Sequence, residues 1–90
     1  MNKAAKIFAA LAEPTRLEIL LQLSKRSGCV SGLQLKLNRS QPNISQHLRV
    51  LREAGLVKSR RDGKKVCYSL SSSAVARLIS AAEKLGGREW

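Results

Sequence analysis

Residues 40–70 have the sequence SQPNISQHLRVLREAGLVKSRRDGKKVCYSL, which predicts a capped helix followed by a two-stranded hairpin. Ser40 can cap the helix, because its hydroxyl can accept a hydrogen bond from an N–H group of the first turn. Pro42 fits that first turn, where a missing N–H costs nothing, and Gly55 ends the helix. One face of this helix, predicted over residues 41–53, carries the apolar residues Ile44, Leu48 and Leu51. Their i, i+4, i+7 spacing is typical of a helix that packs on a core.

The residues that follow Gly55 predict the hairpin. Its first strand begins at Leu56, and Asp62-Gly63 is a dipeptide typical of a tight turn. The return strand has three alternating residues that face inward, Val66, Tyr68 and Leu70. A polar helix beside a basic hairpin is suited to enter a DNA groove and to contact the flanking backbone.

The positive charge of the chain is large and localised. The chain has 90 residues, enough for one domain over residues 1–90, and a formal net charge of +11. Residues 25–65 hold eleven Lys and Arg residues against Glu53 and Asp62, so this segment carries +9 of the total. Such a field favours a polyanionic partner, either nucleic acid or an anionic membrane. No apolar run is long enough to span a bilayer and no signal peptide is recognisable, so we expect a cytoplasmic protein with no membrane partner.

Four further helices are predicted outside the opening stretch, and three of them are described first. Residues 2–12 form an amphipathic helix, a mostly apolar helix starts near Pro14 and ends before Gly28, and residues 72–86 form a last amphipathic helix. The apolar stripes of the two terminal helices are either monomer core or dimer interface. We favour the interface, because a chain this small covers only part of its apolar surface. The predicted dimer contacts are Ile7, Phe8, Leu11, Val75, Leu78, Ile79, Ala82 and Leu85.

A short segment connects the second predicted helix to residue 40. Residues 29–31 are either a short strand or a loop, and Ser31 can cap a short helix. The apolar positions of that helix are Leu33, Leu35 and Leu37. Two helices joined by three or four residues, the second with a polar outer face, form a helix-turn-helix arrangement.

The polar side chains on the helix over residues 41–53 are the candidate base-reading groups. Asn and Gln can pair bidentately with adenine, although any one of these residues could instead contact phosphate or cap the helix. His47 could donate to a phosphate or pack against the preceding helix. It is not a plausible catalytic base, because no nucleophile or carboxylate accompanies it in this motif. The predicted DNA-binding residues here are Ser40, Gln41, Asn43, Ser45, Gln46, His47 and Arg49.

Four cations bracket the predicted Asp62-Gly63 turn. We expect them to lie on phosphate or in a minor groove; the alternative is a solvated hairpin with no binding role. These candidate residues are Arg60, Arg61, Lys64 and Lys65.

Two segments resemble the ArsR/SmtB family of winged-helix repressors. They are ALAEPTRLEILLQL at residues 10–23 and the opening stretch, which has the family's Ser-Gln-x-x-x-Ser-x-His-Leu helix and Arg-x-Gly-x-x-Val-x-Tyr wing. The resemblance implies a winged helix-turn-helix fold that is mainly α with a small β-ribbon (α+β), in the order four helices, two strands and a helix. It also implies a homodimer on a palindromic operator, with the operator-reading helix and a wing over residues 58–66 in contact with the DNA. Members of the family are often released from DNA by a metal ion or a thiol reagent.

The metal sites that the resemblance would imply are incomplete. In place of a Cys-Val-Cys motif the chain has Cys29-Val30-Ser31, with no third soft ligand near Gln34. A single thiolate does not make a three-sulfur site for a soft metal. The zinc-sensing branch carries Asp/His pairs on its last helix, but residues 72–85 contain neither His nor Asp. We therefore predict no metal and no cofactor, and the effector is unknown.

The two cysteines, Cys29 and Cys67, suggest a different form of regulation. In a cytosolic protein they are more often free or buried thiols than a structural disulfide. In the winged-helix topology, however, the segment before the helix-turn-helix pairs with the second wing strand, so the two thiols could be cross-strand neighbours. Our hypothesis is a redox or thiophilic-ligand switch coupled to the wing. The alternative, which the sequence alone favours, is two unrelated small residues, with Cys29 half-buried and Cys67 simply tolerated.

These observations favour a sequence-specific DNA-binding transcriptional regulator, acting as a homodimeric repressor. The alternative is a non-specific or architectural nucleic-acid-binding protein, although a surface made only for phosphate does not need a row of base-reading amides. A protein–protein module is disfavoured by the net charge of +11. An enzyme is not predicted, because no paired carboxylates, metal cluster or nucleophile–base pair stands out. The predicted partners are double-stranded DNA and a second copy of the chain.

Overall fold

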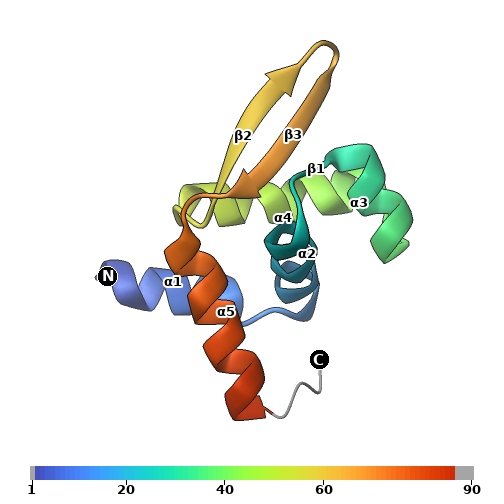
Figure 1. Ribbon diagram of the computed structural model, residues 1–90. Helices are drawn as coiled ribbons and strands as arrows, with labels where there is room; N and C mark the ends of the chain where they lie inside the picture. Colours follow the sequence, from blue (N-terminus) through green and yellow to red (C-terminus); the bar gives the residue numbers. More distant parts are fainter. Residues whose placement is uncertain (1, 87–90) are drawn as a thin grey trace.

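The computed structural model describes residues 2–86; residue 1 and residues 87–90 of the predicted domain lie outside the described residues. Within that range the chain forms five helices and a small antiparallel sheet (Figure 1). The helices are α1 (Lys3–Leu11), α2 (Pro14–Lys25), α3 (Val30–Leu37), α4 (Gln41–Glu53) and α5 (Ser73–Gly86). The strands are β1 (Gly28–Cys29), β2 (Val57–Asp62) and β3 (Lys65–Leu70). The predicted order of helices and hairpin strands is confirmed, with β1 as a short additional strand.

The local sequence explains where the helices begin and end. Three side chains each accept a hydrogen bond from an N–H group in the first turn of a helix: Asn2 in α1, Glu13 in α2 and Ser40 in α4. Pro14 is the first residue of α2, where no N–H is required. Gly55 follows α4 with a φ of 81°, a left-handed conformation that glycine adopts without strain. The predicted cap at Ser40 and the predicted start near Pro14 are therefore confirmed.

The core forms around α2, which contacts the other four helices and β3. Ile19 and Leu20 of α2 are fully buried, in agreement with the apolar circumference of this helix. The three residues predicted for the inner face of α4 are also fully buried: Ile44, Leu48 and Leu51. Burying each such side chain stabilises the folded chain by about 1.5–3 kcal/mol relative to leaving it exposed. This packing fixes which face of α4 remains at the surface.

The sheet has the strand order β1-β3-β2. The hairpin pairs Val57 with Leu70 at its base and Asp62 with Lys65 at its tip, so the loop consists of the two residues between them. The turn is therefore one residue later than the predicted Asp62-Gly63 dipeptide, because Asp62 still belongs to the ladder. Gly63, the first loop residue, has a φ of 64°. A type II′ turn requires a positive φ at this position, which explains the glycine.

Two details of α3 differ from the sequence prediction. The helix begins at Val30, so its N-cap residue is Cys29, whose side chain makes no capping hydrogen bond. Ser31 lies inside the helix and is not its cap. Leu33 is buried, but Leu35 is 86% exposed, because residues two apart lie on nearly opposite sides of a helix. Asn38 follows α3 in a left-handed conformation, with a φ of 54°, and turns the chain toward α4. None of the helices within the described range is long and apolar enough to cross a membrane.

Candidate nucleic-acid interface

The outer face of α4 carries the polar residues predicted to read bases. Gln41, Gln46 and Arg49 are exposed, whereas Asn43 and Ser45 are half-buried. The amide nitrogen of Gln41 donates a hydrogen bond of 2.7 Å to the hydroxyl of Ser45, one turn along the helix. Ser45, Gln46 and Arg49 line one surface depression. The helix therefore presents amide, hydroxyl and guanidinium groups on one continuous surface.

Asn43 lies deeper than its neighbours on this face. Its backbone N–H donates to the Ser40 hydroxyl at 3.3 Å, so it is part of the helix cap. Its side-chain oxygen is buried and has no hydrogen-bond partner in the part of the chain that the structure describes. An unpaired buried acceptor is costly, and the start of α4 therefore has one acceptor that residues 2–86 do not use.

His47 faces the N-terminus of α2. Its Nδ1 atom lies 3.5 Å from a guanidinium nitrogen of Arg16 and 4.0 Å from a carboxylate oxygen of Glu13. Arg16 also donates to the carbonyl oxygen of Ala10 at 2.6 Å, which links the end of α1 to the same cluster. Of the two predicted roles for His47, these contacts support packing, although against α2 and not against α3. Sequence reasoning missed Arg16, because its contact with His47 spans 31 residues and no local pattern indicates it.

Glu13 is the acidic member of this cluster and caps α2. Burial alone would raise the pKa of Glu13, but the hydrogen bond from the Arg16 N–H and the nearby His47 hold this pKa below its ordinary value. The carboxylate therefore stays ionised at neutral pH. An ionised group at this position is also favoured by the positive end of the α2 dipole.

The four cations predicted at the wing lie around the tip of the hairpin. The two on β2 are Arg60 and Arg61, Lys64 is in the loop, and Lys65 begins β3. All four are exposed, and none forms an ion pair within residues 2–86. The hairpin projects from the helical part of the molecule (Figure 1). These charges therefore extend into solvent, where a polyanion can reach them.

The helix α4 and the hairpin are adjacent elements. Residues 38–40 join α3 to α4, which confirms the predicted helix-turn-helix arrangement. α4 packs against α3 on one side and against β2 on another. The outer face of α4 and the hairpin therefore belong to neighbouring, packed elements.

Cys29 and Cys67 lie directly opposite each other in the β1–β3 ladder, which is one of the two arrangements that the sequence left open. Their sulfur atoms form a disulfide, with the two Cα atoms 3.8 Å apart. The expectation of free thiols is therefore not met in this structure. The redox state of the cytosol carries no information about the strand register, and here the register places the two cysteines side by side. No cluster of three or more His, Cys, Asp or Glu side chains with metal-binding geometry occurs among residues 2–86. The disulfide joins the strand before the helix-turn-helix to the hairpin.

The residues predicted for the dimer interface occupy three environments. Val75 and Ile79 are buried in the core of the single chain, at 7% and 2% exposure, because α5 packs on α2 and β3. They offer no free surface. Phe8 and Leu85 are 60% and 91% exposed. Four further residues are half-buried: Ile7, Leu11, Leu78 and Ala82.

The sequence is similar to those of known transcriptional regulators over most of its length. The family described as "Bacterial regulatory protein, arsR family" matches residues 13–59. The chain is 36% identical over 89 residues to the HTH-type transcriptional repressor SmtB of Mycobacterium tuberculosis, a match that covers 99% of this chain and 66% of that repressor. The chain therefore spans about two thirds of the length of this curated relative.

Solved structures share the fold. Reduced HlyU from Vibrio cholerae superimposes with a TM-score of 0.85 at 38% identity, covering 92% of this chain and 87% of that chain. A homodimeric winged helix-turn-helix DNA-binding domain from Mycobacterium bovis, described as a possible ArsR-family regulator, superimposes with a TM-score of 0.90 at 28% identity, covering 94% and 79%. The matched region contains α2, α3, α4 and the start of the wing. The chain belongs to the ArsR family of bacterial regulatory proteins and has a winged helix-turn-helix fold, and its family consists of transcriptional regulators and not of enzymes.

Proposed function

We propose that this chain is a cytoplasmic, homodimeric transcriptional repressor that binds a palindromic operator in double-stranded DNA. The helix over residues 41–53 lies in the major groove, and the wing over residues 58–66 contacts the adjacent backbone or minor groove. A dimer presents two such helices about one turn of duplex apart, which matches two inverted half-sites. A dimer bound to the operator then sterically prevents RNA polymerase from binding the same DNA.

The observation that carries this proposal is the polar outer face of α4 beside an unpaired cationic hairpin tip. Contact with phosphate alone needs only positive charge, which Arg60, Arg61 and the two lysines of the tip supply. Gln41 and Gln46 add amide groups that donate and accept at the same time, which is what the edge of an adenine requires. The named function of the mycobacterial relative, a transcriptional repressor, supports the same conclusion.

Two exposed apolar side chains support the homodimer. Phe8 lies on α1 and Leu85 on α5, the two helices at the ends of the chain. Single exposed apolar residues are common, but here they adjoin the half-buried residues Ile7, Leu11 and Ala82 of the same helices. The M. bovis neighbour, which has the same fold, is homodimeric.

The disulfide between Cys29 and Cys67 is the proposed regulatory element. It ties β1, which leads directly into α3, to the second strand of the wing. A dithiol reductant transfers two electrons to this bond, leaves two cysteine thiols and itself becomes a cyclic disulfide. The wing then keeps its hydrogen bonds but is no longer covalently connected to the helix-turn-helix. We expect the oxidised form to bind operator more tightly, because its wing is preorganised.

Selection of bound duplexes from a random pool, with and without dithiothreitol, tests both parts of this function. The expected result is a pair of inverted half-sites with a fixed spacing, enriched more strongly by the oxidised chain. A specificity ratio near one over random duplex would instead support a non-specific, architectural protein. Equal enrichment in both redox states would refute the regulatory role of the disulfide and leave sequence-specific binding intact.

A further inference from the structure

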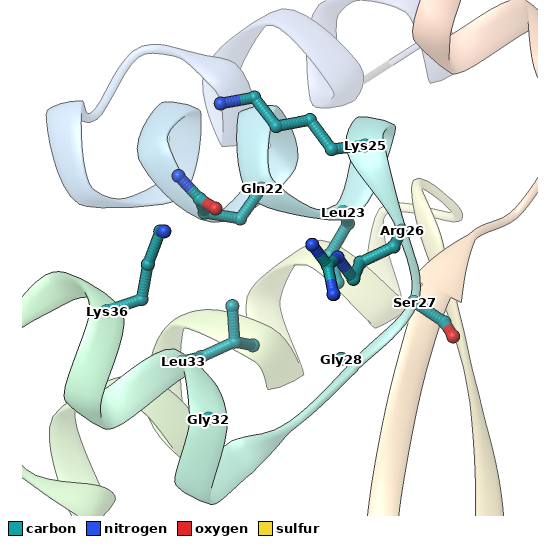
Figure 2. Close-up of a pocket in the computed structure, with 9 residues that line it drawn as sticks. All are labelled: Gln22, Leu23, Lys25, Arg26, Ser27, Gly28, Gly32, Leu33 and Lys36. Carbon is teal, nitrogen blue, oxygen red and sulfur yellow. The ribbon is translucent and has the colours of Figure 1, made fainter.

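A pocket of about 400 Å³ lies between the end of α2 and α3 (Figure 2). None of the residues that line it comes from α4 or from the hairpin. Its size is within the range of small-molecule sites in proteins. The pocket is therefore separate from the surface proposed to bind DNA.

Three cations line this pocket, and no carboxylate from residues 2–86 does. Lys25 is the last residue of α2, Arg26 directly follows it, and Lys36 comes from α3. Figure 2 shows the Lys36 side chain and the Arg26 guanidinium group on opposite sides of Leu33. None of the three cations is in an ion pair within the described range. Like charges around one hollow repel each other and create a positive potential that attracts an anion.

The base of the pocket is apolar. Leu23 and Leu33 form it, and each is only 4% exposed. Gly28 keeps this base accessible, because a methyl group added there would lie 3.7 Å from a Leu23 methyl carbon and 3.9 Å from Leu33 Cγ. A cationic rim above an apolar base suits a ligand that has an anionic group and an apolar body.

We propose that this pocket binds a small organic phosphate. The phosphate group lies between Arg26 and Lys36, because a guanidinium donates two parallel hydrogen bonds to phosphate oxygens and an ammonium adds a point charge. The apolar part of the ligand rests on Leu23 and Leu33. A phosphate of the DNA backbone has the same anionic chemistry, but it carries no apolar group to fill the base of the pocket.

The position of the pocket connects it to the disulfide. Gly28 is part of its lining and immediately precedes Cys29. Ser27 lines this pocket and also the hollow that contains Cys67. A bound ligand therefore contacts the strand that the disulfide joins to the wing.

Nuclear magnetic resonance titration of the oxidised 90-residue chain, without DNA, tests this site independently of DNA binding. The probes are phenyl phosphate and inorganic phosphate, with sodium chloride at matched ionic strength as the reference. We expect saturable shifts of the Gly28 and Gly32 amide signals, at lower concentration for phenyl phosphate than for inorganic phosphate. Replacing Arg26→Gln together with Lys36→Gln should weaken phenyl phosphate binding at least about tenfold, the scale of losing charge-assisted hydrogen bonds.

The matched control is Lys3→Gln together with Lys84→Gln, which removes the same charge from exposed positions on α1 and α5. Equal weakening in both double variants, or no saturation with phenyl phosphate, overturns the proposal. Shifts of these amides by duplex DNA but not by phenyl phosphate would assign the cations to the DNA backbone and also overturn it. Gly28→Ala keeps every charge and covers the apolar base, so it should weaken phenyl phosphate binding but not inorganic phosphate binding. If this variant still preferred phenyl phosphate to inorganic phosphate, the proposed contact between the ligand and the apolar base of the pocket would be refuted.

Discussion

The Nδ1 atom of His47, in the helix proposed to read DNA, lies 4.0 Å from a carboxylate oxygen of Glu13, the residue that caps α2. The same carboxylate accepts a hydrogen bond of 2.9 Å from the backbone N–H of Arg16. α4 is therefore held against the central helix by a polar contact as well as by its buried apolar face. The charge of Glu13 bears on the stability of both helices.

Replacing Glu13→Gln should destabilise the chain more at pH 7 than at pH 3. The pKa of Glu13 is lowered in the folded chain, because the Arg16 N–H and His47 outweigh the opposing effect of burial. A group with a lowered folded pKa contributes stability above its unfolded pKa, and this contribution disappears as the pH falls through the folded value. Thermal unfolding of the unmodified chain and of the Glu13→Gln variant at pH 3 and pH 7 measures this contribution to stability. An equal difference in Tm at pH 3 and pH 7 would show that the charge contributes nothing.

Replacing Ser40→Ala should lower the free energy of unfolding by about 0.5–2 kcal/mol. Its hydroxyl accepts a hydrogen bond of 3.3 Å from the Asn43 N–H, a group that has no partner within the helix itself. Urea unfolding measures the change. Ser80→Ala is the control, since Ser80 is exposed in the interior of α5 and its replacement should stay within about 0.5 kcal/mol. Similar decreases in the two variants would contradict a specific capping role.

The elements that were predictable are those specified by neighbouring residues. Ser40 caps α4, and the apolar spacing of Ile44, Leu48 and Leu51 identifies its buried face, because both effects act within a few turns of one helix. The hairpin was predictable for the same reason, apart from a shift of one residue in its turn. The resemblance to a known family added the pairing of β1 with β3, which no local pattern indicates.

The features that were missed depend on contacts between distant segments. Leu33 and Leu35 lie on nearly opposite sides of α3, and only the packing of α3 against α2 and α4 decides that the side of Leu33 is covered and the side of Leu35 is exposed. The contact between Arg16 and His47 requires the finished arrangement of α2 and α4. The disulfide likewise requires a register that places Cys29 opposite Cys67.

Wing and recognition-helix substitutions should have different effects on DNA binding. Replacing Arg60→Gln together with Lys64→Gln should weaken binding to all duplexes and reduce the slope of log affinity against log salt by about 0.9 for each DNA phosphate that the variant no longer neutralises. Gln46→Ala should leave that slope unchanged and reduce discrimination between operator and random DNA by about 1–3 kcal/mol. Fluorescence anisotropy over a series of salt concentrations measures both quantities. Reduced discrimination in the wing variant alone would reverse the proposed roles.

Exposed apolar residues on the terminal helices should maintain the dimer. Replacing Phe8→Ser together with Leu85→Ser removes two large exposed apolar groups from the proposed interface and should raise the dimer dissociation constant at least about tenfold, since each buried side chain of this size contributes roughly 1.5–3 kcal/mol. Sedimentation equilibrium measures the change. Leu35→Ser is a matched control, because Leu35 is 86% exposed but lies on α3. If only this control dissociated the dimer, the interface would have to lie on α3.

Cys67→Ser should make operator binding insensitive to dithiothreitol. In the unmodified chain we expect reduction to weaken operator affinity about tenfold, within the usual range for coupling between two sites, because β1 and the wing are no longer covalently joined. The variant cannot form the bond, so its affinity should equal that of the reduced unmodified chain under both conditions. Anisotropy titrations with the selected operator, before and after reductant, compare the four states. A reductant effect that persists in Cys67→Ser would place the redox response outside this disulfide, and an unmodified chain that binds equally well in both states would show that the disulfide only stabilises the fold.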